Sequence, residues 1–320
     1  MAEKNGSVKS RNRLVIVHIL SAVLTIAALA LCFFLYQQSL PLKEENETLL
    51  KELEAREAAL AETDAKMDEI SDTLAYYTGM KDNLESTKKE YFDIISDLEQ
   101  KILNGESDVK IAYLTFDDGP YYLSTKFLDV LDEYDVPATF FYLMKCAETG
   151  FEDQDADYDA IYRRIIASGH TLGNHTSIHK FGPTGVYSSV DAFKKSVIDN
   201  KNFIYERYGY TTNVFRFPGG SDTARSKSYV QDMIDYLVSE GYGYVDWNAA
   251  TGDGGKVVLS AAEYRDNVLT ATGGKNILVV LMHDYSNNTL ACLPEIIEGL
   301  DRQGYIFLPM FNGSVMCKKQ

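Results

Sequence analysis

The feature that most constrains this chain is a long uncharged run near its N-terminus, from Leu14 to Tyr36. An α-helix needs about 20 apolar residues to cross the hydrocarbon core of a bilayer, so the run is long enough to span a membrane. The preceding segment, 1–13, carries four basic residues and one acid. Because basic residues stay on the cytoplasmic side, we expect a cytoplasmic tail at 1–13, a transmembrane helix at 14–36 and the rest of the chain outside the cell.

A cleaved signal peptide is the alternative interpretation of the same run. Its apolar region would be shorter, about 7–15 residues, and a small-x-small cleavage site would follow it. Residues 36–41 read Tyr-Gln-Gln-Ser-Leu-Pro and offer no such site. We therefore prefer an uncleaved single-pass anchor in the cell membrane.

The segment 37–104 has the pattern of a coiled-coil stalk, because apolar residues recur at alternate steps of four and three. The apolar steps are Leu42, Leu49, Leu53, Leu60, Met67, Ile70, Leu74, Tyr77, Leu84, Tyr91, Ile95, Leu98 and Ile102. The intervening steps at Asn46, Arg56, Thr63, Lys81 and Lys88 are polar, and Gly79 marks a potential break. We expect a parallel stalk that makes the protein a homodimer and reaches on the order of 100 Å from the membrane. The alternatives are a lone solvated helix and a hairpin folded back near Gly79.

Strands and helices alternate beyond the turn signal at 104–107. The expected strands are Ile111–Phe116, Ala138–Leu143, Asn213–Phe217, Gly243–Asp246 and Ile277–Met282, and the expected helices include Phe127–Tyr134, Tyr158–Ala167, Val190–Tyr208 and Val230–Gly241. This alternation predicts one α/β domain over 105–320, built on a parallel sheet or a (β/α) barrel.

The charge and the cysteines exclude some classes of function. A net charge of −16 argues against a nucleic-acid partner and against an anionic polymer held by charge, which leaves neutral or cationic substrates. No C-x-x-C pair occurs among Cys32, Cys146, Cys292 and Cys317, so a zinc knuckle or thioredoxin-type centre has no support. We expect the last three to be buried apolar residues, with one disulfide among them as the alternative.

Two adjacent carboxylates follow the first expected strand. Residues 115–120 read Thr-Phe-Asp-Asp-Gly-Pro, which places Asp117 and Asp118 where (β/α) folds carry their active sites. Adjacent acids on a loop point in different directions, so one can bind a cation while the other acts as a base. Alone, the run is also an ordinary turn.

A spaced pair of histidines stands out because the chain has only five. His175 and His179, at i and i+4, would lie on one face of a helical turn and could bind one metal ion. Imidazole and carboxylate together suit Zn²⁺, and a catalytic zinc takes three protein ligands. Two surface histidines are the alternative.

Two further runs leave expected strands. His283 follows Ile277–Met282 and suits a proton donor, although a buried core histidine is the alternative. Residues 215–220 read Phe-Arg-Phe-Pro-Gly-Gly, so Arg216 can reach a neighbouring carboxylate and the glycine amides can point at an oxyanion. Alone, this run is an ordinary turn.

The four runs, in this order, resemble the polysaccharide deacetylases of the NodB type, which remove acetyl groups from N-acetylated glycans. The resemblance covers roughly Asp108 to the C-terminus. It implies a distorted (β/α) barrel and one divalent metal ion, commonly zinc, with cobalt or another divalent ion as alternatives. The metal ligands would be Asp118, His175 and His179.

The resemblance also implies the other roles. Asp117 would be the general base that deprotonates the attacking water, and Arg216 would hold it in place. The backbone N–H of Gly219 would share the oxyanion with the metal, and His283 would protonate the leaving amine.

This chain departs from the family pattern at two positions. An aromatic residue often follows the proline of the arginine motif, and here Gly219 stands there. An aspartate supports the catalytic histidine in the family, and we choose Asp253, with Asp246 in reserve. A tryptophan often follows that aspartate, whereas Gly254 does here, so the pocket for the acetyl methyl group would be built differently, with Leu281 still available.

The resemblance and the anchor together imply a metal-dependent hydrolase of an extracellular N-acetylated polysaccharide. We favour peptidoglycan of a cell wall, with secreted exopolysaccharide second. Three alternatives stay open: an esterase for O-acetylated glycans, a catalytically inactive glycan-binding module, and a stalk that recruits a membrane partner.

Overall fold

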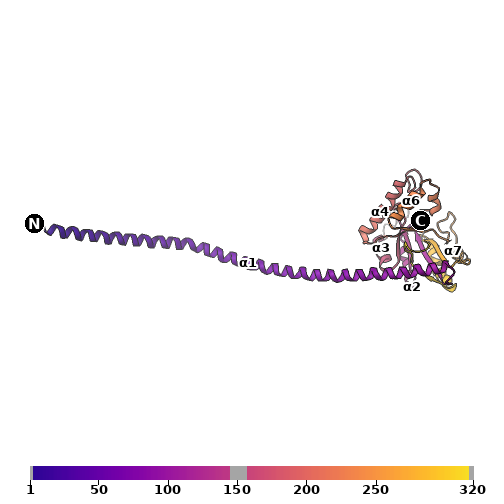
Figure 1. The fold of residues 1–320 in the computed structure, drawn as a ribbon, viewed down its shortest axis with the longest axis horizontal. Coiled ribbons are helices and arrows are strands. Elements are labelled where there is room, and N and C mark those ends of the chain that lie inside the picture. The colour runs from indigo at the N-terminus through magenta and orange to yellow at the C-terminus, as the bar shows by residue number, and fades with distance from the viewer. Residues whose placement is uncertain (1–2, 145–156, 317–320) are drawn as a thin grey trace. The chain divides into compact units, whose positions relative to one another are not determined.

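The computed structural model describes residues 3–144 and 157–316, without the side chains of 3–17, 19 and 76–85. By its internal contacts the chain divides into two compact units, Met1–Glu85 and Ser86–Gln320. Helix α1 (Glu3–Leu103) belongs to both units, because its last turns lie beyond Glu85. Figure 1 follows this helix from the N-terminus.

In the first unit α1 is uninterrupted. It continues through Pro41 and Gly79, so the helix does not break at the glycine and the hairpin alternative is wrong. Its N-terminal part is long and apolar enough to cross a membrane. The apolar steps from Leu42 to Leu74 are exposed, and Leu53, Leu60 and Met67 expose 53%, 61% and 63% of their surface. Pairing of this seam with a second helix stays a prediction.

The last turns of α1 form part of the second unit. Ile95 and Ile102 are buried, and Ile102 lies in one apolar cluster with Tyr113 and Phe141. The carboxylate of Glu99 is fully buried and accepts a hydrogen bond of 2.5 Å from the Tyr113 hydroxyl. Ile95 and Ile102, two positions of the predicted coiled-coil seam, therefore pack into the core of the second unit.

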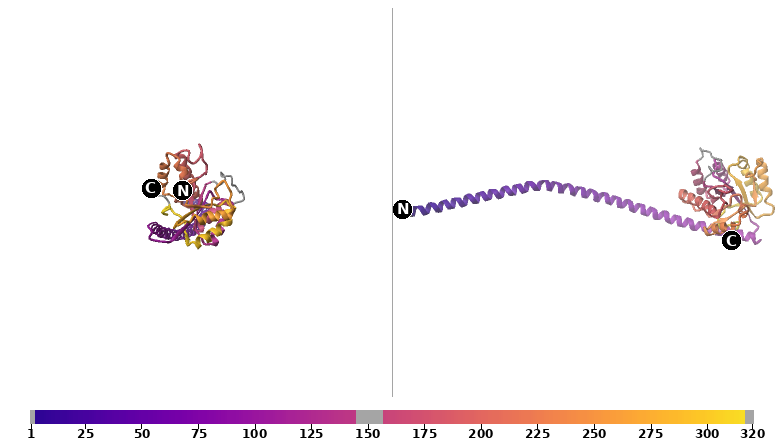
Figure 2. Two further views of the ribbon diagram at one scale, coloured as in Figure 1. Left: turned by 90° about the vertical axis from the view of Figure 1, so that its right-hand side faces the viewer. Right: turned by 90° about the horizontal axis from the view of Figure 1, so that it is seen from above.

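The second unit is built on parallel strands. They are β1 (Lys110–Asp117), β2 (Ala138–Tyr142), β3 (Thr171–Asn174), β4 (Val214–Phe215), β5 (Gly243–Tyr244), β6 (Ala249–Ala250), β7 (Ile277–His283) and β8 (Tyr305–Phe307). Their order is β5-β4-β3-β2-β1-β7-β6, and β8 pairs with β1. Every pairing is parallel. The sheet curls into a half-barrel with helices around it (Figures 1 and 2), which confirms the expected distorted (β/α) barrel class.

The helices of this unit connect successive strands. They are α2 (Ser124–Glu133), α3 (Tyr158–Ala167), α4 (Val190–Tyr208), α5 (Ser221–Arg225), α6 (Val230–Ser239), α7 (Ala261–Thr270) and α8 (Asn287–Arg302). Both α3 and α4 have the bounds expected from the sequence. Their ends are well marked, because Asp157 and Ser189 accept N-cap hydrogen bonds and Gly209 closes α4 at φ 65°.

Candidate active site

The strand register brings the candidate residues to one edge of the sheet. Asp117, the last residue of β1, pairs with His283 on β7 on one side and with Phe141 on β2 on the other. His175 directly follows β3, and Arg216 directly follows β4. Because all these strands are parallel, their carboxyl ends meet, which is where (β/α) folds assemble their sites.

Asp118, His175 and His179 form a cluster in which one ligand atom from each lies within 4.8 Å of the others. Asp118 Oδ1 lies 3.2 Å from His175 Nε2 and 3.7 Å from His179 Nε2. This cluster is the one group of potential metal ligands found among the described residues. The donor set, one carboxylate and two imidazoles, fits a borderline divalent cation such as Zn²⁺ and leaves coordination positions open.

The two histidines lie in a loop, so the expected helical turn is wrong. The Asn174 side-chain oxygen accepts a hydrogen bond of 2.8 Å from the Thr176 N–H, and Thr176 has a φ of 74°. A side chain that bonds the backbone two residues ahead favours a turn over a helix. The loop nevertheless brings both imidazoles to Asp118.

The hydrogen bonds of His175 fix which nitrogen can bind a metal. Its Nδ1–H donates to the Arg216 carbonyl oxygen at 2.8 Å, and a carbonyl can only accept. The lone pair of a neutral His175 therefore lies on Nε2, the atom that faces Asp118. A fixed tautomer of this kind is what metal-binding imidazoles need, so the residues present fit the implied cation.

The charges around Asp118 keep it anionic. Burial alone would raise the pKa of Asp118. When His175 is protonated, however, its hydrogen bond to Asp118 and the positive charges of His175, His179 and His283 outweigh burial and hold the pKa of Asp118 well below its usual range. For His179 burial acts in the other direction: it lowers the pKa and so favours the neutral imidazole. An anionic carboxylate and a neutral imidazole are the protonation states that bind a metal ion.

Asp117 takes part in a separate, buried ion pair. Its Oδ1 accepts from Arg216 Nη1 at 2.8 Å, and the arginine is fully buried. The guanidinium also donates to the Thr115 hydroxyl at 2.7 Å and lies 4.3 Å from the centre of the Phe141 ring. The two adjacent aspartates thus have different partners: Asp118 faces the imidazoles and Asp117 faces the arginine.

His283 reaches the cluster from β7, the strand next to β1. Its Nε2 lies 3.7 Å from Asp118 Oδ2, and its Nδ1 lies 2.8 Å from Asp253 Oδ1. Burial would lower the pKa of His283, but the hydrogen bond and charge of Asp253 outweigh it and raise the pKa to about 9. Asp246, the reserve choice for this support, instead accepts hydrogen bonds from the backbone N–H and the hydroxyl of Ser221.

The remaining expected residues lie around this centre. Gly219 has a φ of 70°, a left-handed conformation that favours glycine, and Thr223 Oγ1 donates to its carbonyl at 2.7 Å. Gly254 packs against the His283 ring, because a Cβ there would lie 2.7 Å from His283 Cε1. Leu281 is partly exposed on β7, two residues before His283.

A buried network behind the site has no counterpart in the sequence predictions. Asp284 Oδ2 accepts hydrogen bonds from the Ser124 hydroxyl at 2.5 Å and from the Tyr142 hydroxyl. Burial raises the pKa of Asp284 to about 6. The Tyr142 ring fills the space beside Gly119, where a Cβ would lie 2.1 Å from it. The network therefore fixes the loop that follows Asp118, and an acid directly after a candidate histidine is the signal that could have revealed it.

Neither of the two cysteines within the described residues belongs to the metal-ligand cluster. Cys292 is a buried free thiol, as expected, whereas Cys32 is exposed on α1. Cys146 and Cys317 lie outside the described residues.

Comparisons with known proteins agree with the fold. A model of the polysaccharide deacetylase family matches residues 104–236. The chain is 30% identical to a peptidoglycan-N-acetylglucosamine deacetylase of Bacillus cereus over 62% of its own length and 68% of the relative.

Two solved structures extend the likeness to three dimensions. The catalytic domain of peptidoglycan N-acetylglucosamine deacetylase from Eubacterium rectale matches with 31% identity and a TM-score of 0.58, over 66% of this chain and 93% of that one. A CE4 esterase of Streptococcus mutans matches with 29% identity and a TM-score of 0.56, over 67% of this chain and 90% of that one. The family model covers the motifs from Asp117 to Arg216, and the chain belongs to the polysaccharide deacetylase family.

Proposed function

We propose that this protein is a metal-dependent hydrolase that removes acetyl groups from the N-acetylated sugars of an extracellular polysaccharide, with peptidoglycan as the favoured polymer. The observation that carries the proposal is the convergence of three groups on one point. The Asp118–His175–His179 cluster lies between a base candidate held by Arg216 and an acid candidate held by Asp253.

The metal would be held by Asp118 Oδ1 and by the Nε2 atoms of His175 and His179. A divalent ion bound there supplies a Lewis acid that polarises the acetyl carbonyl, and zinc is the ion that this donor set favours. The tautomer of His175 and the anionic state of Asp118 support this assignment.

The protein groups would move the protons. Asp117 takes a proton from the attacking water, and Arg216 keeps its carboxylate oriented. The Gly219 N–H donates to the oxyanion that develops on the acetyl oxygen. His283, charged because of Asp253, gives its proton to the departing sugar nitrogen, so that acetate and a free amine leave.

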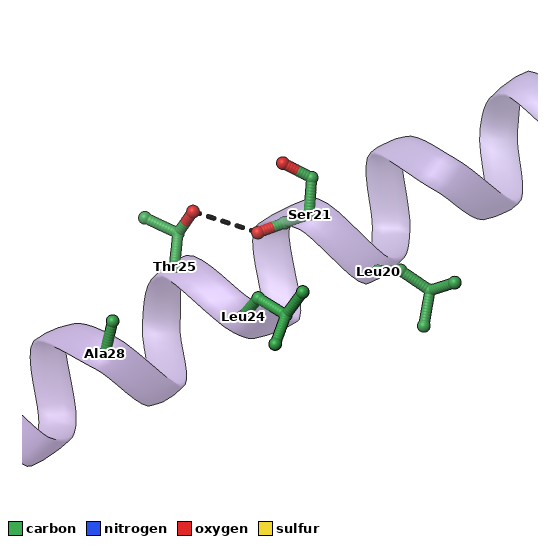
Figure 3. Close-up of a pocket in the computed structure, with 5 residues that line it drawn as sticks. All are labelled: Leu20, Ser21, Leu24, Thr25 and Ala28. Carbon is green, nitrogen blue, oxygen red and sulfur yellow. Dashed lines mark hydrogen bonds between the residues drawn. The ribbon is translucent and has the colours of Figure 1, made fainter.

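The long apolar segment of α1 supports a proposal for the cellular location of the enzyme. We propose that the stretch 14–36 anchors the chain in the cell membrane. The part of 37–104 that precedes the turns buried in the second unit would hold the enzyme outside the membrane as a coiled-coil stalk. In the anchor region Thr25 Oγ1 donates to the Ser21 carbonyl at 2.9 Å, as Figure 3 shows. This hydroxyl is satisfied within the helix, as a residue facing lipid must be. The exposed apolar seam supports a parallel homodimer.

The proposal is tested by acetate release. The purified full-length chain should release acetate from N-acetylated oligosaccharides and from peptidoglycan, and Asp117→Asn should abolish the release while the protein still binds zinc. Unchanged release by Asp117→Asn would show that the assigned base is wrong. Muropeptide mass analysis of a deletion strain then identifies the polymer in the cell.

Hydrolysis of O-acetyl esters is the second candidate, because one solved relative is a CE4 esterase and another similar protein is a bifunctional xylanase/deacetylase of Pseudobutyrivibrio xylanivorans. The same residues can cleave an ester. Acetylated xylan and N-acetylated oligosaccharides, offered at equal acetyl concentration, separate the two activities.

A further inference from the structure

An exposed aromatic ring stands beside the candidate site and has no role in the chemistry described above. Phe181 leaves 46% of its surface exposed, although it lies only two residues after His179. Its ring centre lies 5.0 Å from that of His179, edge to face at 86°. On another side, Phe181 Cζ lies 3.4 Å from the position that a Cβ would take on Gly219. The ring thus flanks a candidate metal ligand and the glycine proposed to bind the oxyanion.

The loop around this ring is tightly built. The Val186 N–H donates to the Lys180 carbonyl at 2.8 Å and closes the loop. Gly185 passes so close that a Cβ on it would lie 2.6 Å from Phe181 Cα. The ring also contacts the buried Tyr187, centre to centre at 5.9 Å, and Tyr187 donates its hydroxyl hydrogen to the Pro218 carbonyl. Phe181 is therefore held in place with one side presented to solvent.

From this placement we propose that Phe181 is a sugar-binding platform, on which the apolar face of a pyranose ring of the N-acetylated glycan stacks. This rests on the proposed function and adds the group that holds the sugar. Burying an aromatic side chain covers about 150–250 Å², so the exposed part of Phe181 amounts to on the order of 90 Å². It is far below the 1,200 Å² or so of a stable protein interface.

A merely structural role for Phe181 makes a different prediction. If the ring only held the His179 imidazole in position, its loss would weaken metal binding and lower kcat. If the ring holds the sugar, its loss raises KM, because the contact is made equally in the ground state and the transition state.

The test uses the full-length, zinc-loaded protein and a β-1,4-linked tetrasaccharide of N-acetylglucosamine. Phe181→Ala should raise KM about tenfold, equivalent to about 1.4 kcal/mol, with kcat and zinc content unchanged. Phe181→Trp should restore KM, whereas Phe181→Leu, which is apolar but has no ring, should not. Tyr205→Ala removes an even more exposed aromatic ring, 59% exposed, from α4 and should behave as the wild type.

Binding of the same tetrasaccharide to the inactive Asp117→Asn protein, with and without Phe181→Ala, is measured by calorimetry. An unchanged KM and an unchanged affinity would overturn the platform, and so would loss of zinc together with a fall in kcat. If the wild-type protein releases no acetate, the proposed function fails. Calorimetry still decides the platform in that case, since a tetrasaccharide that binds equally well without the ring, or not at all, refutes it.

Discussion

Replacing Arg216 by Met should strongly destabilise the second unit. The guanidinium is fully buried, and Asp117, its partner at 2.8 Å, is 3% exposed. Methionine fills much of the same volume but leaves the carboxylate without its cation. Removing one partner of a buried ion pair costs about 3–5 kcal/mol, because the remaining charge is neither solvated nor paired. That is a large fraction of the 5–15 kcal/mol that stabilises a typical domain.

A second substitution separates this electrostatic cost from lost packing. Asp117→Asn, added to Arg216→Met, removes the stranded charge, so the double variant should recover at least about 2 kcal/mol of the loss. Neither variant should release acetate, because each lacks an ionised, oriented Asp117. Stability and activity therefore change independently in this pair.

Urea unfolding, followed through tryptophan fluorescence, provides the measurement. Trp247 is the single tryptophan of the chain and lies in the second unit, so the signal excludes the unfolding of the first. Arg225→Met is the matched control, because Arg225 pairs with a fully exposed Asp222 at 3.8 Å and should cost under about 0.5 kcal/mol. A cost below about 1 kcal/mol for Arg216→Met, or no recovery in the double variant, would refute the buried pair as the cause.

Three further predictions concern acid stability, the Asp118 loop and the metal. Burial lowers the pKa of His170 from 6.5 to about 4, so between these pH values the unfolded chain binds a proton that the folded chain does not. The free energy of unfolding should therefore fall by up to about 3 kcal/mol as the pH drops from 6.5 to 4. His170→Asn should make the urea midpoint less dependent on pH over this range. Gly119→Ala should lower the free energy of unfolding by about 1–3 kcal/mol and reduce acetate release, because its Cβ meets the Tyr142 ring that Asp284 holds. Equal activity would contradict that fit. Chelation of the metal should stop acetate release and lower the urea midpoint. Zinc at 100 times its Kd should then raise the free energy of unfolding by about 2.7 kcal/mol. A midpoint that changes with neither treatment would exclude the cluster as a metal site.

The sequence predicted the elements whose signals are local. Helices α3 and α4 combine an apolar stripe with capping residues, and their ends are as expected. No expected strand corresponds to β6 or β8, which contain two and three residues. The equally short β4 and β5 were predicted only as parts of longer runs. The four-residue β3, just before His175, was also missed, although it positions both imidazoles.

The site residues could be predicted as types and positions in the chain, but their pairing could not. Nothing local to Asp246 or Asp253 tells which one reaches His283, because both follow short strands. The choice depends on β6 lying beside β7, a long-range pairing that places Asp253 next to the histidine. Phe181 is likewise an unremarkable loop residue until the turn at Gly185 lays it against Gly219.

The final turns of α1 determine where the protein can be divided. Ile95 and Ile102 are part of the core of the second unit, and Ile102 shares its cluster with Phe141, the ring that lies beneath Arg216. A fragment that begins at the turn 104–107 would therefore lack Ile102, which packs in the cluster of Phe141 and Tyr113. The Tyr113 hydroxyl would also lose its acceptor, Glu99. Any exchange of the proposed anchor for another has to be made upstream of Ser86, inside a continuous helix. If the stalk pairs as proposed, its heptad register must be preserved across the junction.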